Sequence, residues 1–192
     1  MKLFFCDIET SGLDEREHGI LQISGEIIIP NKDDISIMLK PRLFPSDVFD
    51  PDASAVNGIS ATEAYSEARP TPNDTLTTFT KILDKYVNRY NRQDKLIFVA
   101  YNATFDDRFL RKFFEKCNNR YYGSYFHWPP IDVAVLAMEH LKNVRETLPN
   151  FKLHTVAKHF NIAVEEGKLH DASYDIWLTK TIYSYITKEE VK

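Results

Sequence analysis

Residues Leu3–Asp14 have the sequence LFFCDIETSGLD, an apolar run that ends in the alternating acids Asp7 and Glu9 and a polar turn. The apolar residues predict a strand over Lys2–Ile8 that becomes buried on both faces. Because successive strand residues point to opposite faces, Asp7 and Glu9 face the same way. Two unit charges about 4 Å apart repel by about 4 kcal/mol at an effective dielectric of 20. The pair indicates either a metal site or two solvated loop acids, and this segment alone leaves both open.

The spacing of apolar residues predicts the other elements. Strands are expected over Gly19–Pro30, Ile35–Lys40 and Leu96–Tyr101, and helices over Asn73–Tyr90, Thr104–Cys117, Ile131–Leu141, Leu153–Phe160 and Asp171–Thr187. The Pro-, Asp- and Ser-rich stretch Pro41–Thr71 is too long for a turn and is expected to be a functional loop or to hold a short helix. Three meandering strands followed by alternating helix and strand predict an α/β domain with a mixed sheet.

Two further acids lie in the first turns of expected helices. Asp106 shares a helix face with Phe109 and Phe113 and is therefore expected to point toward the sheet. Asp107 is turned about a further 100° around the helix and is expected to face water. Asp175 repeats the inward arrangement at the start of the last helix.

One histidine accompanies this last acid. His170 precedes Asp175 by five residues, and Asp171 between them is placed to cap the helix. One strand end and two helix starts thus offer inward carboxylates, and in α/β sheets ligands bind beyond the carboxyl ends of the strands. Carboxylates without thiolates suit hard cations such as Mg²⁺ or Mn²⁺. This donor set favours phosphoryl chemistry by two metals about 3.5–4 Å apart.

Composition sets outer limits on the function. The 192 residues fit one domain, 1–192, and 24 Lys and Arg against 28 Asp and Glu give a net charge of −4. This balance excludes a strongly basic nucleic-acid glove but allows a local basic patch. No run approaches the roughly 18 apolar residues of a membrane span, so no membrane partner is expected. The two cysteines, Cys6 and Cys117, lie in apolar runs, and with no secretory signal they favour a cytoplasmic protein.

Three segments together resemble the motifs of the DEDD 3′-5′ exonucleases in their histidine form (DEDDh), which include the DnaQ-like proofreaders and RNase T. The first motif is matched by Phe5–Asp14 (FCDIETSGLD), the second by Val99–Leu110 (VAYNATFDDRFL) and the third by His170–Asp175 (HDASYD). The order and spacing agree, and the resemblance spans about residues 1–187. It implies a ribonuclease-H-like α/β fold with a central mixed five-stranded sheet flanked by helices. It also implies hydrolysis of phosphodiester bonds from the 3′ end, with release of nucleoside 5′-monophosphates.

The resemblance also implies residue roles. Asp7, Glu9, Asp106 and Asp175 would hold two Mg²⁺ ions, which Mn²⁺ can replace, with Asp7 bridging them. His170 would be the general base that deprotonates the attacking water, which suits an unperturbed pKa near 6.5. The implied substrate contacts are Thr10, Ser11, Gly12, Leu13, Asn57, Gly58, Ile59, Asn102 and Phe105.

Several of these contacts have a second interpretation. Asn57 stands where the family often has histidine, and Tyr101 stands where a histidine usually precedes the asparagine, so both depart from the pattern. Leu13 could stack on a base or tuck into the core, and Phe105 could lie beside the site or be a plain core residue.

The implied substrate is a nucleic acid with a free 3′ end, single-stranded in preference, with DNA favoured over RNA and a role in DNA repair. Arg120–Trp128 is dense in aromatic residues, which could stack on bases, form a homodimer interface or pack in the core. A basic cluster could steer phosphates or be a solvated helix face; its members are Arg108, Arg111, Lys112, Lys116 and Arg120.

Three rival interpretations compete with a free-standing exonuclease. An HD-type phosphohydrolase could be built on His170–Asp171, but His154 and His159 do not share a helical face well, and Asp7 and Glu9 would be unexplained. The second rival is a proofreading subunit bound to a DNA polymerase, and the third is a non-catalytic nucleic-acid-binding module on the same fold. All five chemical residues are present, which argues against lost catalysis. A free-standing enzyme is favoured over a subunit, and co-purification with a polymerase would separate the two.

Overall fold

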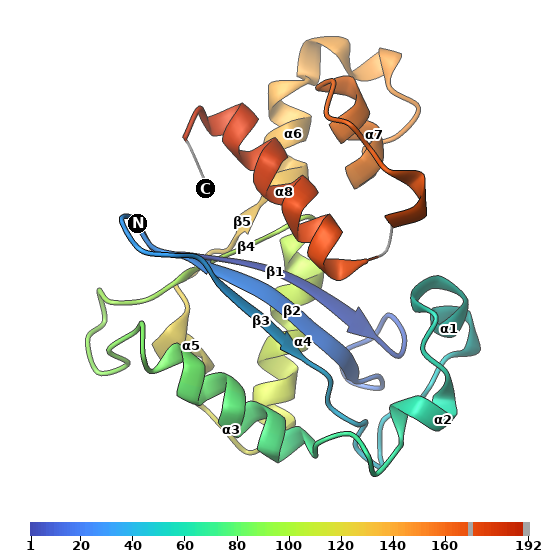
Figure 1. Cartoon of the computed structure of the whole chain (residues 1–192), viewed down its shortest axis with the longest axis vertical. Coiled ribbons are helices and arrows are strands. Elements are labelled where there is room, and N and C mark those ends of the chain that lie inside the picture. The colour runs from blue at the N-terminus through green and yellow to red at the C-terminus, as the bar shows by residue number, and fades with distance from the viewer. Residues whose placement is uncertain (169–170, 190–192) are drawn as a thin grey trace.

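A computed structural model describes residues 1–168 and 171–189 of the chain. Its strands form one mixed sheet in the order β3-β2-β1-β4-β5 (Figure 1). The strands are β1 (Leu3–Thr10), β2 (Ile20–Ile28), β3 (Ile35–Leu39), β4 (Ile97–Ala100) and β5 (Ile131–Asp132). β1, β2 and β3 pair antiparallel, whereas β4 lies parallel to β1, and β5 parallel to β4. The expected mixed five-stranded sheet is confirmed.

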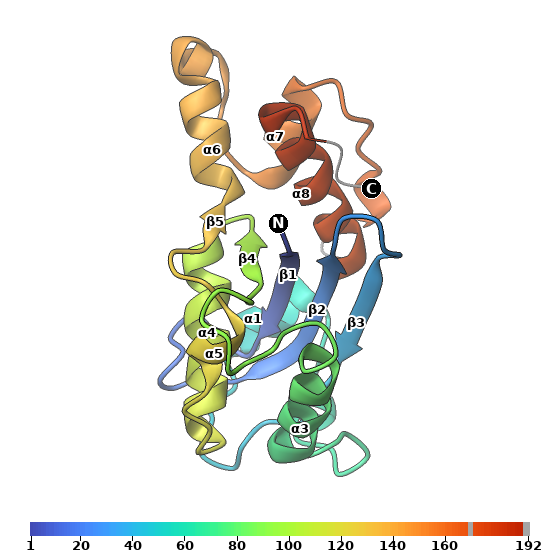
Figure 2. The ribbon, with the colours of Figure 1, turned by 90° about the vertical axis from the view of Figure 1, so that its left-hand side faces the viewer.

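Helices cover both faces of this sheet. They are α1 (Pro51–Asn57), α2 (Ala61–Ala64), α3 (Pro72–Leu83), α4 (Ala103–Lys116), α5 (Tyr122–Tyr125), α6 (Val133–His140), α7 (Leu153–His159) and α8 (Ala172–Thr187), with 3-10 turns at Lys142–Thr147 and Glu166–Lys168. Figure 2 shows α6, α7 and α8 at one end of the molecule and α3, α4 and α5 at the other. The Pro41–Thr71 stretch holds two short helices, α1 and α2.

Two apolar cores lie on the two faces of the sheet, and β1 contributes to both. Phe4, Cys6 and Ile8 face the core under α3 and α4. Leu3 and Phe5 face the core under α6, α7 and α8. Because strand side chains alternate, Asp7 and Glu9 continue the row of Leu3 and Phe5, on the side of α8.

Two helices, α3 and α6, have boundaries that differ from the sequence expectation. The helix expected over Asn73–Tyr90 ends at Leu83. It begins earlier than expected because Thr71 caps it: the Thr71 Oγ1 accepts a hydrogen bond from the Asp74 amide at 3.1 Å. The helix expected over Ile131–Leu141 is wrong at its start, where Ile131–Asp132 forms β5. Asp132 then caps α6 by accepting the Ala134 amide at 2.9 Å.

The expectation that Asp107 faces water is also wrong. Its side chain is only 5% exposed, because α5 packs against that side of α4. The Tyr122 hydroxyl donates to the Asp107 carboxylate, and Arg111 lies 3.5 Å from it. None of the helices within residues 1–168 and 171–189 has the length and apolar character of a bilayer-spanning segment.

Candidate active site

The carboxyl end of β1 lies between the start of α8 and α1 (Figure 1). Asp7 and Glu9 occupy the last part of this strand, and the β1–β2 pairing is irregular between Glu9 and Thr10. Asp106 lies in the first turn of α4, and Asp175 in the first turn of α8. The four acids, which lie far apart in the sequence, are thus carried by the carboxyl end of the central strand β1 and by the first turns of α4 and α8.

Asp106 connects the first turn of α4 to β1. Its side chain is buried, and its Oδ1 accepts a hydrogen bond from the backbone amide of Ile8 at 3.0 Å. That amide lies between Asp7 and Glu9 along the strand, so the contact fixes the helix start against the acidic end of β1.

Electrostatics connect the four carboxyl groups. Burial raises the pKa of Asp7 well above its usual range, and the charges of Glu9 and Asp175 raise it further. Burial and then the charge of Asp175 raise the pKa of Glu9 to about 7. The pKa of Asp106 is likewise raised well above its usual range by burial and by Asp7. Each of the four carboxyl groups thus either raises the pKa of another member of the group or has its own pKa raised by another member.

This donor set fits hard divalent cations. The four groups supply oxygen ligands only, and their burial and mutual repulsion are the cost that a bound cation would offset. Among the residues that the structure describes, no group of three or more His, Cys, Asp or Glu side chains is placed to hold a metal ion, so the fit rests on the chemistry of the donor set.

His170 lies outside the described residues, whereas the cap next to it is described. Asp171 begins α8 as predicted, with its Oδ1 accepting the Tyr174 amide at 3.0 Å. This cap fixes the first turn of α8, which carries Asp175.

A hollow of about 350 Å³ opens beside Glu9. It is lined by the end of β1, by Gly12 and Leu13 of the following loop, by Phe105 of α4 and by residues of Asp50–Asn57. Its lining is mainly apolar, with Asp50 and Asp52 at α1. Leu13 is 78% exposed, so the interpretation that it tucks into the core is wrong.

The structure divides the expected substrate contacts into two groups. Thr10, Gly12, Leu13, Asn57 and Phe105 line the hollow, and Ser11, Gly58, Ile59 and Asn102 do not. Ile59 is instead buried in a small cluster with Leu21, Leu43 and Ala64.

Asn57, which departs from the family pattern, connects the end of α1 to the end of β1 beside the hollow. Its Nδ2 donates to the carbonyl of Thr10 at 3.1 Å, and its Oδ1 accepts the Ile59 amide at 3.0 Å. Ser11 has a similar supporting role, because its Oγ donates to the carbonyl of Val48 at 2.6 Å and accepts the Gly19 amide at 3.0 Å. Both side chains hold α1 and the segment before it against the loop after β1.

The packing of the fold itself favours glycine at position 12, in addition to any close approach of a ligand. A Cβ at this position would lie 2.0 Å from Cδ2 of the His18 ring, which packs directly on the glycine. Any side chain there would displace the His18 ring or the loop.

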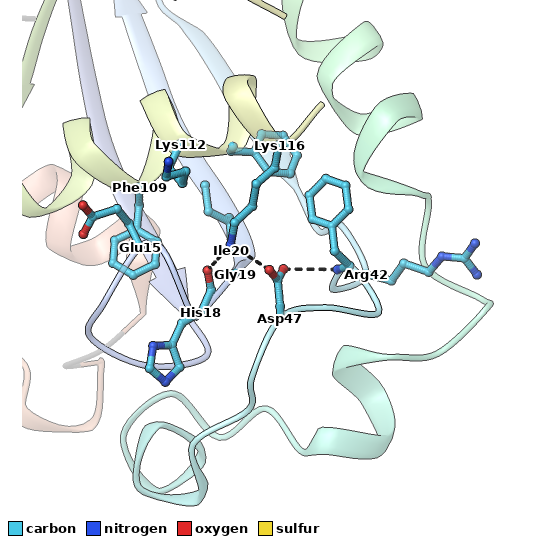
Figure 3. A pocket seen from close by; sticks show the side chains of 11 residues that line it. Glu15, His18, Gly19, Ile20, Arg42, Asp47, Phe109, Lys112 and Lys116 are labelled. Carbon is cyan, nitrogen blue, oxygen red and sulfur yellow. Dashed lines mark hydrogen bonds and ion pairs between the residues drawn. The ribbon is translucent and has the colours of Figure 1, made fainter. Parts of the chain in front are cut away.

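A buried ion pair that the sequence analysis missed supports the same loop (Figure 3). The Lys116 Nζ donates to Asp47 Oδ1 at 2.7 Å and to the His18 carbonyl at 2.7 Å. The other Asp47 oxygen accepts the Phe44 amide at 3.2 Å. Lys116 and Asp47 are 69 residues apart in the sequence, and no local pattern marks them as partners.

The chain has the ribonuclease-H-like class of α/β fold, and comparison with solved structures confirms this expectation. Neither a family model nor a curated protein matches the sequence. The zinc-bound complex of E. coli exonuclease I with single-stranded DNA superposes with a TM-score of 0.76 at 20% identity, over 97% of this chain and 40% of that one. The structure of exonuclease I that addresses its processivity gives 0.74 at 20% identity, over 98% and 41%.

A product-bound exonuclease I gives a TM-score of 0.71 at 18% identity, over 97% of this chain and 43% of that one. The chain thus spans about two fifths of the length of these proteins. At such identities the likeness establishes the fold.

Proposed function

We propose that residues 1–192 form one exonuclease domain that removes nucleoside 5′-monophosphates from the 3′ end of single-stranded DNA. The observation that carries the proposal is the gathering of four mutually repelling carboxyl groups from β1, α4 and α8 beside a mainly apolar hollow. The fold is that of exonuclease I, whose structures include complexes with single-stranded DNA and with dT13 and dA16 oligonucleotides.

Asp7, Glu9, Asp106 and Asp175 are the residues that would hold the metal, two Mg²⁺ ions or Mn²⁺ in their place. The chemistry that bound divalent ions would supply there is a lowered pKa of bound water and stabilisation of negative charge on phosphate and leaving oxygens. The Ile8 amide holds Asp106 in place, and the Asp171 cap holds the helix turn that carries Asp175.

The hollow would receive the terminal nucleotide. Exposed Leu13 and half-buried Phe105 offer apolar contacts for a base, and the Asn57 contact to Thr10 keeps the α1 wall in position. His170 would accept the proton of the attacking water, since an imidazole with a pKa near neutrality suits that role.

The test uses an oligothymidylate labelled at its 5′ end, with a free or a blocked 3′ end. We expect stepwise shortening of the free substrate, resistance of the blocked one, complete loss of hydrolysis in EDTA and recovery on addition of Mg²⁺ or Mn²⁺. Matched duplex DNA and RNA arms measure the substrate preference. Hydrolysis that survives exhaustive chelation would exclude the metal, and immediate release of the labelled mononucleotide would reverse the direction.

The same assay tests His170. His170→Ala should lower the rate by about 10²–10⁴-fold, as removal of a general base does, while the affinity for the oligonucleotide in EDTA stays the same. His154→Ala, on α7, is the matched control and should retain the wild-type rate. Normal turnover of the His170 variant would remove this residue from the mechanism.

A further inference from the structure

One face of the molecule, distinct from the hollow, carries exposed aromatic side chains paired with arginines. We call it the Arg–aromatic face and define it by Arg89, Tyr90, Arg111, Tyr121 and Trp128. The three aromatic side chains are exposed by 84%, 61% and 75%, in the order Tyr90, Tyr121 and Trp128.

The structure sorts the aromatic stretch Arg120–Trp128 into two roles. Tyr122, Tyr125 and Phe126 are buried in the core under α3 and α4. Tyr121 and Trp128 remain on the surface. Core packing therefore accounts for one part of this stretch and does not account for Tyr121 and Trp128.

Each arginine of the face lies against two aromatic rings. The Arg111 guanidinium carbon is 4.4 Å from the centroid of Tyr122 and 5.9 Å from that of Trp128. The Arg89 guanidinium carbon is 5.2 Å from the centroid of Tyr90 and 6.0 Å from that of Tyr121. Flat guanidinium groups and rings ordered in this way are the surfaces on which unpaired bases stack and to which phosphates bind.

The positive charge of the face is only partly neutralised. Arg111 is shared with buried Asp107, at 3.5 Å. Arg89 has no carboxylate ion pair among the residues that the structure describes. Three other members of the expected basic cluster are less available, since Lys116 is paired with Asp47 and Lys112 with Glu115, and Arg108 lies 4.0 Å from Glu15.

Helix α4 connects the face to the candidate active site. Asp106 lies in its first turn, and Arg111 lies five residues later, about 7.5 Å further along the helix axis. Figure 2 shows α5 beside α4, with the segment that joins α3 to β4 next to both. The Leu96 amide donates to the Tyr125 carbonyl at 2.9 Å, which holds that segment and its Arg89–Tyr90 pair against α5.

We propose that the Arg–aromatic face binds the single strand on the 5′ side of the nucleotide being removed. Unpaired bases stack on Trp128, Tyr121 and Tyr90, and Arg111 and Arg89 contact the phosphates between them. This inference rests on the proposed exonuclease function and adds a second binding region to it. Only substrates long enough to reach past the hollow gain from the face, and duplex bases are not free to stack there.

The experiment measures binding and turnover as a function of substrate length, with the full chain. Oligothymidylates of about 3 and about 20 nucleotides are compared, because single-strand-binding surfaces occupy roughly 4–16 nucleotides. Fluorescence anisotropy in EDTA gives the affinity without hydrolysis, and steady-state assays in Mg²⁺ give kcat and KM. The variants are Trp128→Ala, Tyr121→Ala and Arg89→Ala. The control is Arg145→Ala, because Arg145 lies 5.2 Å from the Phe151 ring in another part of the molecule.

We expect Trp128→Ala and Tyr121→Ala each to weaken binding of the long oligonucleotide by about tenfold, the size that loss of one stacked base produces, and Arg89→Ala to weaken it by a similar factor through the lost phosphate contact. KM for that substrate should rise by the same factor, while kcat and all constants for the short substrate stay at wild-type values. The Arg145 control should match wild type at both lengths. Equal behaviour of the variants and wild type on the long substrate would overturn the inference, and so would an equal loss at both lengths.

The two proposals fail in distinguishable ways. A wild-type protein that hydrolyses DNA but whose variants show no length-dependent loss refutes the face alone. A protein that binds the long strand through the face without hydrolysing it retains the face and refutes the nuclease. A wild-type protein that binds neither oligonucleotide refutes both.

Discussion

Glu9 illustrates how a single buried acid can serve a site at the expense of stability. Its pKa in the fold is about 7 against an ordinary 4.5, because of burial and the charge of Asp175. An acid whose pKa is raised on folding holds its proton in the native state over a pH range in which the unfolded chain has released it. The native state then binds more protons than the unfolded state, so stability falls as pH rises from about 4.5 to about 7.

Glu9→Gln should therefore stabilise the metal-free protein at neutral pH while abolishing hydrolysis. The expected gain in the free energy of unfolding in EDTA is about 1–3 kcal/mol at pH 7, since one pKa unit corresponds to 1.36 kcal/mol. The gain should disappear near pH 4, where both states hold the proton. Chemical denaturation at the two pH values measures it, with exposed Glu139→Gln as the matched control. A gain that is the same at both pH values would contradict the electrostatic explanation.

Residues 44–50, which include Asp47 and which we call the strap, support the candidate site. Residues 44–50 bond to the loop after β1 through the Val48 amide to the Glu17 carbonyl at 2.8 Å and the Asp50 amide to the Ser11 carbonyl at 2.8 Å. Lys116 of α4 closes this arrangement by its bonds to Asp47 and to the His18 carbonyl. These bonds thus connect the loop after β1, the segment that leads into α1, and helix α4.

Lys116→Met should destabilise the protein by about 3–5 kcal/mol, because it leaves the buried Asp47 carboxylate without its cation. Urea denaturation gives the free energy, and Lys112→Met, which removes a more exposed pair with Glu115, is the control and should cost about 1 kcal/mol or less. The double variant Lys116→Met/Asp47→Asn should recover part of the loss. If Lys116→Met costs no more than the control, the strap does not hold this part of the fold.

The elements that the sequence predicted well are those with one dominant pattern. The strand β1, with apolar residues facing both cores, and the helices α4 and α8, with their apolar spacing, were located to within two residues. The end of α3 was not, because Tyr86 and Val87 continue the apolar pattern beyond the helix, and the two residues before α6 were assigned to that helix although they form β5. A strand of that length has no periodicity to detect, and only its neighbour β4 defines it.

At the candidate site, the sequence predicts the features that depend on local periodicity and misses those that depend on contacts between distant segments. The sequence predicts Asp7, Glu9, Asp106 and Asp175 as candidate site residues because strand and helix periodicity and the motif spacing fix the side from which each acid points. Asp107 was misplaced because its burial depends on Tyr122, which is 15 residues away and on another helix. Asp47 and Lys116 were missed for the same reason, and Ile59 fills a small core that only the folded Pro41–Thr71 stretch creates.

Over the whole molecule, the acidic end of β1 and the Arg–aromatic face are two separate regions of opposite charge. The chain carries a net charge of −4. Four acids gather near the carboxyl end of β1, whereas Arg89 and Arg111 lie on the Arg–aromatic face. A substrate phosphate would be repelled from the acidic end unless cations are bound there. The proposed metal would thus have an electrostatic role in admitting the substrate as well as in the reaction.

Divalent ions should therefore stabilise the folded chain as a whole. Ligands that bind only the native state add about 2.7 kcal/mol at a concentration of 100 times their dissociation constant, so the melting temperature should rise with Mg²⁺ or Mn²⁺ and return to its starting value in EDTA. The rise should be larger at pH 8 than at pH 5, because the raised pKa values of Asp7 and Glu9 leave those groups partly protonated at the lower pH. Asp7→Asn should abolish most of the effect, and Glu139→Gln should leave it intact. A rise that is unchanged in Asp7→Asn would place the cation elsewhere on the molecule and separate the acidic end of β1 from metal binding.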